Sequence, residues 1–91
     1  MQKTLIHQDK DNKHYLIRAD EKIFPIIYFH HHLGRYQRNT RNPDWERVTI
    51  CVYEKSGCDY EIGETIARFQ FDGVGCVDEA NRKLAKLILH L

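Results

Sequence analysis

The chain has 91 residues, which suffices for one domain with a modest hydrophobic core. Its 14 Lys and Arg residues nearly balance its 13 Asp and Glu residues, so the whole chain is neither a polycation for nucleic acid nor an acidic mimic of it. Because no apolar run approaches the roughly 18 residues of a membrane span, and neither a secretory signal nor a disulfide framework is evident, we expect a cytoplasmic protein with reduced cysteines and no membrane contact.

The first third of the chain favours β-structure. Residues 4–7 and 14–19 predict two short strands, and the Asp- and Asn-rich turn at 9–12 between them predicts a hairpin. Residues 23–33 are ambiguous. Their Ile, Tyr and Phe content favours a strand buried on both faces, whereas a proline near the start and a glycine just past the end would suit a helix.

Residues 34–47 predict a long polar loop, since they show no clear periodicity. The loop interleaves arginines with aromatic residues, a combination that contacts phosphates and bases and is also enriched at protein interfaces. The candidate binding residues are Arg35, Tyr36, Arg38, Arg41, Trp45 and Arg47. A less specific interpretation is a solvated loop whose tryptophan folds back onto the core.

The second half of the chain predicts two longer strands and a helix. Residues 47–54 form two alternating rows that could both be buried, which indicates a central strand. Residues 59–72 predict a strand with one solvated face and a bulge or bend at Gly63. Over residues 77–91 the apolar positions step by three and four, as on one stripe of a helix. The stripe comprises Val77, Ala80, Leu84, Leu87, Ile88 and Leu91.

Together these elements predict a single α+β domain over residues 1–91. We expect a mostly antiparallel sheet of four or five strands with the C-terminal helix packed on one face. One helix cannot cover both faces, so Thr49, Cys51 and Tyr53 would lie on the other. We expect an apolar patch there that a homodimer covers, unless residues 23–33 or the arginine-containing loop wrap over it.

The run from His30 to His32 is the most conspicuous candidate metal ligand. On a strand, His30 and His32 share a face, and imidazole suits zinc, copper or nickel. Two ligands do not complete a site, and His7 or His14 would supply a third only if their strands were neighbours of this one. Solvated or hydrogen-bonded histidines are the simpler interpretation, so we expect no metal and no other cofactor.

Cys76 lies at the predicted start of the last helix, where a helix N-terminus can lower the pKa of a thiol. No sequence signature of a cysteine enzyme surrounds it, so a buried residue at the junction of sheet and helix is the favoured interpretation. Nucleotide-binding glycine motifs and the serine-hydrolase motif are also missing. We therefore expect no catalytic residues.

The sequence thus favours a small non-enzymatic binding or regulatory module that acts through protein–protein contact, with itself or with a partner. The alternative is a module that binds single-stranded nucleic acid through the arginines of residues 35–47. Short domains without motifs are frequent among accessory proteins of phages and other mobile elements, which is an expectation from size alone.

Overall fold

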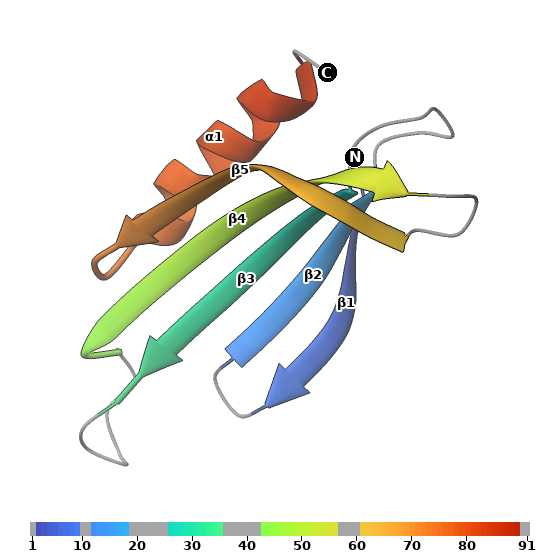
Figure 1. Cartoon of the computed structure of the whole chain (residues 1–91). Coiled ribbons are helices and arrows are strands. Elements are labelled where there is room, and N and C mark those ends of the chain that lie inside the picture. Colours follow the sequence, from blue (N-terminus) through green and yellow to red (C-terminus); the bar gives the residue numbers. More distant parts are fainter. Residues whose placement is uncertain (1, 10–11, 19–25, 36–42, 57–60, 90–91) are drawn as a thin grey trace.

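A computed structural model describes residues 2–9, 12–18, 26–35, 43–56 and 61–89 (Figure 1). Its elements are β1 (Gln2–Asp9), β2 (Asn12–Arg18), β3 (Ile26–Gly34), β4 (Trp45–Ser56), β5 (Glu61–Asp72) and α1 (Cys76–Leu89). Each strand pairs antiparallel with its neighbours in sequence, in the order β1-β2-β3-β4-β5. The predicted α+β fold is confirmed, with a five-stranded antiparallel sheet and one C-terminal helix.

The ambiguous segment forms the central strand β3. It is hydrogen-bonded to β2 on one side and to β4 on the other. Ile26, Ile27 and Phe29 are all buried, so side chains of both parities are shielded, as the strand interpretation predicted. β-Branched and aromatic side chains suit such a strand because they pack well on a pleated surface. Residues 23–25 lie outside the described part of the chain.

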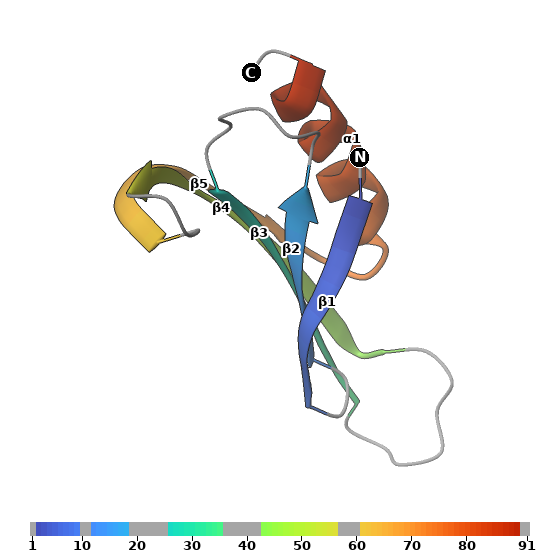
Figure 2. The ribbon, with the colours of Figure 1, turned by 90° about the vertical axis from the view of Figure 1, so that its right-hand side faces the viewer.

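The hydrophobic core lies between the sheet and α1, which covers one face only (Figure 2). Ala80 and Leu84 are fully buried against the fully buried Val48 and Ile50 of β4. The apolar stripe of the helix therefore faces the sheet as predicted, with Leu91 outside the described residues. Leu89, which the pattern placed off the stripe, is 81% exposed.

The far end of the β4–β5 hairpin bends away from the helix (Figure 2). The pairing register shifts between Val52 and Lys55 of β4. Gly63 lies close to this irregularity, where an added Cβ would come within 2.9 Å of the Glu54 carbonyl oxygen. The predicted bend at Gly63 is confirmed, and it curves the hairpin over the face that α1 leaves uncovered.

The connection between β3 and β4 is shorter than the loop predicted over residues 34–47, because Trp45, Glu46 and Arg47 belong to β4. Trp45 pairs with Gly34 at the end of β3, and its indole lies where a Cβ of residue 34 would be, 2.1 Å from Nε1. The glycine thus makes room for the large ring on the neighbouring strand. Predicting a loop up to residue 47 was wrong because this cross-strand contact extends the ladder by two residues.

Candidate functional site on the open sheet face

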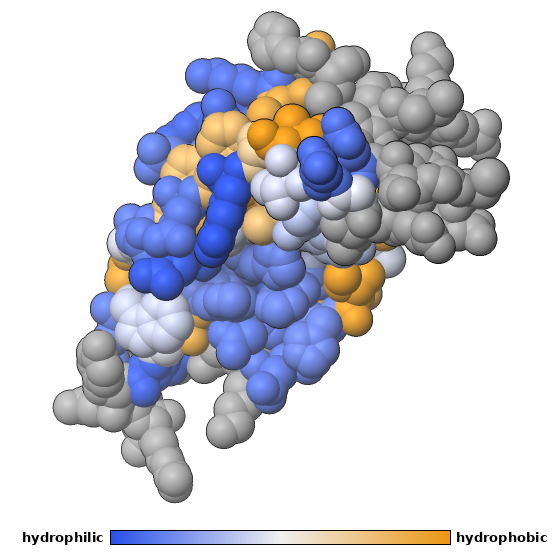
Figure 3. Space-filling model, viewed as in Figure 1, coloured by the Kyte–Doolittle hydropathy of each residue, from blue (hydrophilic) through white to orange (hydrophobic). Residues whose placement is uncertain are grey.

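The sheet face opposite α1, which we call the open face, carries the candidate site. It presents His14 and Leu16 of β2, Tyr28, His30 and His32 of β3, Arg47, Thr49, Cys51 and Tyr53 of β4, and Arg68, Gln70 and Asp72 of β5. Hydrophilic side chains gather over the middle of this face (Figure 3). Thr49 and Cys51 are each only 8% exposed, because larger polar neighbours shield them. The predicted apolar patch was therefore wrong.

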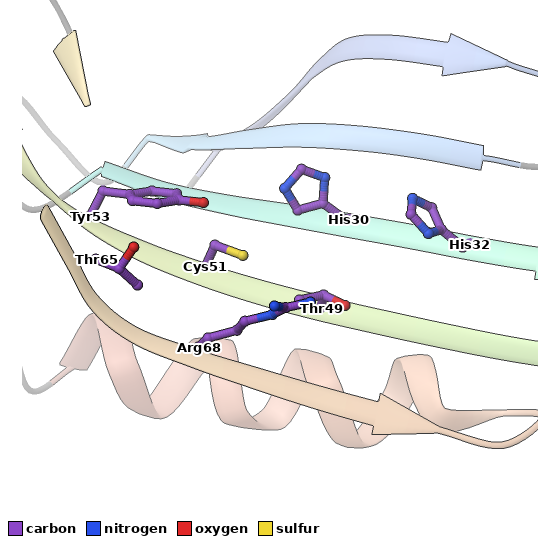
Figure 4. Close-up of a pocket in the computed structure, with 7 residues that line it drawn as sticks. All are labelled: His30, His32, Thr49, Cys51, Tyr53, Thr65 and Arg68. Atoms are coloured by element: carbon purple, nitrogen blue, oxygen red, sulfur yellow. The ribbon is translucent and has the colours of Figure 1, made fainter. Parts of the chain in front are cut away.

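An open depression of about 370 Å³ occupies the centre of this face (Figure 4). It is lined by His30, His32, Thr49, Cys51, Tyr53, Thr65 and Arg68. The bend of the β4–β5 hairpin brings Thr65 opposite Tyr53, while Arg68 extends across β4 toward Thr49. Among the described residues that line the depression none is acidic, so it offers groups that both donate and accept hydrogen bonds and one fixed positive charge.

Three histidines form a cluster beside the depression. The antiparallel register places His14 directly opposite His30, and their rings meet edge to face with centroids 4.4 Å apart. The Nε2 atoms of His14 and His32 lie 2.8 Å apart, at hydrogen-bond distance. β2 is thus a neighbour of β3, which is the condition under which His14 would supply a third ligand to His30 and His32.

The surroundings of these histidines favour the neutral imidazole. Burial, together with the smaller effects of the nearby His14, His32 and Arg68, lowers the pKa of His30 to about 4. Burial also lowers the pKa of His14 and of His32 from their ordinary value, with neighbouring histidines adding to the effect. Near neutral pH all three side chains therefore have a lone pair available on one ring nitrogen.

His31 has a different environment, because it points to the helix side of the sheet. Its Nε2 donates to Oε2 of Glu46 at 2.5 Å. Oε1 of the same carboxylate accepts the backbone N–H of Gly75 at 2.6 Å, immediately before α1. Glu46 is only 7% exposed, so this acid ties the histidine run to the start of the helix.

Glu46 is a structural residue that sequence reasoning missed, since it was counted with the loop. A signal was present in the chain. Glu46 precedes Val48 and Ile50 by two and four residues. If the alternation of the strand predicted over residues 47–54 is continued two residues toward the N-terminus, the Glu46 carboxylate falls on the core side.

The structure brings only part of the arginine-containing set together. Trp45 and Arg47 lie in β4, where Arg47 Nε donates to the Asp72 carboxylate at 2.6 Å. This bond, with a second from Gln70, lowers the pKa of Asp72. Arg35 is exposed just beyond β3. The predictions for Tyr36, Arg38 and Arg41 lie outside the described residues.

Cys76 is buried at the first position of α1. Its Sγ donates to the carbonyl oxygen of Phe71 at 3.4 Å. Burial raises the pKa of the thiol, and the negative charge of Glu46 raises it further. The favoured interpretation, a buried residue where sheet and helix meet, is confirmed.

Comparisons with models of protein families, with curated proteins and with solved structures found no match. Within the described part of the chain, the helix α1 is too short and too polar to cross a membrane.

Proposed function

We propose that the protein is a non-enzymatic binding module that holds an acidic segment of a partner protein on its open face. The observation that carries this proposal is the depression itself. Arg68 supplies a positive charge there, and Thr49, Thr65 and Tyr53 add hydroxyl groups to the lining. A carboxylate of a partner would complement this set, because arginine pairs with carboxylates through two parallel hydrogen bonds.

A protein partner fits the open face better than a nucleic acid does. Among its described side chains the cations are Arg47 and Arg68, and Arg47 is already paired with Asp72. Strong binding to a phosphate backbone requires several such charges. Tyr28 and Tyr53 stand edge to face with centroids 5.9 Å apart, and tyrosine and arginine are the residues that dominate protein interfaces.

A non-enzymatic role is supported by the state of the candidate nucleophile. Cys76 is buried and its pKa is raised, both of which oppose the thiolate that a cysteine enzyme requires. His31, which lies on the same side of the sheet, is engaged by Glu46. A thiol in this setting contributes to packing.

The experiment is a selection of random displayed peptides on the immobilised chain. We expect enriched peptides to be rich in Asp and Glu, and their synthetic versions to bind in fluorescence anisotropy. Arg68→Glu should weaken that binding at least about tenfold, equivalent to 1.4 kcal/mol. Arg82→Glu makes the same charge change at an exposed position of α1 and should leave the affinity unchanged.

Three results would contradict the proposal. The first is that no acidic peptide is enriched, and the second is that both charge-reversal variants bind equally. The third is tight binding of single-stranded oligonucleotides with a steep dependence on salt, which would favour the alternative function through residues 35–47.

Sedimentation of the free chain tests the homodimer. A dimer that persists on dilution and blocks peptide binding would make a second copy the occupant of this face.

A further inference from the structure

We propose that His14, His30 and His32 together bind one divalent transition-metal ion, with zinc as the expected occupant. The potential ligand nitrogens of the three side chains all lie within 4.8 Å of one another. The inference goes beyond the proposed function and does not rest on it, because the metal ion alone is sufficient to test it.

The spacing of the nitrogens suits a metal ion. With Zn–N bonds of about 2.0–2.1 Å, two ligands of a tetrahedral site are about 3.3 Å apart. The 2.8 Å between the Nε2 atoms of His14 and His32 lies below that value, and the 4.8 Å limit for the whole set lies above it. All three side chains are half-buried, and binding of one ion at equal distances requires their rings to rotate from the positions seen here.

The sheet, and not the histidine run alone, assembles this site. His30 and His32 are two residues apart on one strand, so they share a face, while the register of β2 sets His14 opposite His30. His31 lies between them in sequence but bonds to Glu46 on the other face. The fold therefore selects two of the three consecutive histidines and adds one from 16 residues earlier.

The donor set defines the class of metal. Three neutral imidazoles suit zinc, copper or nickel, whereas calcium and magnesium prefer oxygen ligands. Three protein ligands leave a fourth position that water can occupy. His7 lies beside His14 with ring centroids 5.3 Å apart, but it falls outside the set whose nitrogens converge.

The test is calorimetric titration of zinc chloride into the full chain without a purification tag. We expect one zinc ion per chain. His14→Ala should weaken binding by at least about 100-fold, more than the 10–100-fold typical of losing an outer hydrogen-bond partner of a metal ligand. The matched control is His31→Gln, whose amide can still donate to Glu46, and this variant should bind zinc like the original chain. Circular dichroism establishes that both variants are folded.

Two outcomes would overturn the inference. One is that the folded chain takes up no zinc. The other is that His31→Gln weakens zinc binding while His14→Ala leaves it unchanged, which would mean that the consecutive histidines bind zinc as a peptide tag does. Arg68→Glu separates this inference from the proposed function, because it should weaken binding of acidic peptides and leave the zinc stoichiometry unchanged.

Discussion

The two faces of β3 both carry histidine side chains, but these have different environments and roles. His31 points toward α1 and is held by a buried carboxylate that also accepts a backbone N–H at the start of the helix. His30 and His32 point to the open face, where they meet a third histidine and line a depression. The difference shows that the alternation of the strand, and not the residue type, separates a histidine that organises the fold from histidines that are available to a ligand.

The same contrast extends to the two faces as a whole. The helix side contains the fully buried Phe29, Val48, Ile50 and Leu84, so burial there supplies most of the favourable free energy of folding. On the open face, the buried Thr49 and Cys51 lie beneath polar rings and a guanidinium group. We therefore expect substitutions on the helix side to change stability first, and substitutions on the open face to change binding first.

Leu84→Ala should give the largest effect, because Leu84 is fully buried between the helix and the sheet. We expect a loss of about 2–5 kcal/mol in the free energy of unfolding, measured by urea denaturation. Lys86→Ala, on the exposed side of the same helix, should change it by less than about 0.5 kcal/mol. Equal, small effects of the two variants would mean that the helix does not close the core.

Glu46→Ala should give the next largest effect. It removes the acceptor of both the His31 ring and the Gly75 backbone N–H, leaving two partly buried donors without that partner. We expect a loss of about 1–3 kcal/mol in the free energy of unfolding. Glu79→Ala, which removes an exposed carboxylate from the first turn of α1, is the control and should cost less. If the two variants were equally stable, the buried carboxylate would not tie the helix to β3.

The Cys76 thiol should react slowly with alkylating reagents near neutral pH, and its reaction rate should increase with pH. Because burial and Glu46 raise the pKa of the thiol, less thiolate is present at a given pH than in the unfolded chain. At about pH 8, iodoacetamide should label Cys76 at least about tenfold more slowly in the folded chain than in urea, as quantified by peptide mass spectrometry. Faster labelling in the folded chain would indicate an activated thiol and would support an enzyme.

Much of the fold was predictable because periodicity reports directly on burial. The spacing of Ala80 and Leu84 predicted the helix and its inner face, and the alternation around Ile50 predicted β4, an interior strand of the sheet. The segment containing Phe29 remained ambiguous, because an apolar run buried on both faces has no period that separates strand from helix. Its pairing partners on both sides decided the outcome.

The candidate site was less predictable, because it depends on which strands are neighbours. The sequence showed that His30 and His32 would share a face, but the third histidine required the pairing of β2 with β3. The alternation of β4 could have placed Glu46 on the core side, but the contact of Trp45 with Gly34, which extends the ladder, joins residues 11 positions apart. Local patterns do not contain such information.

The contrast between the histidines of β3 is tested most directly by nuclear magnetic resonance of the imidazole ring nitrogens during a zinc titration. We predict that the ring signals of His14, His30 and His32 shift together and saturate at one zinc ion per chain. The signals of His31 should stay in place, because its Nε2 remains bonded to Glu46 on the opposite face. Shifts of His31 together with His30 and His32, while His14 is unaffected, would contradict a site assembled by the sheet.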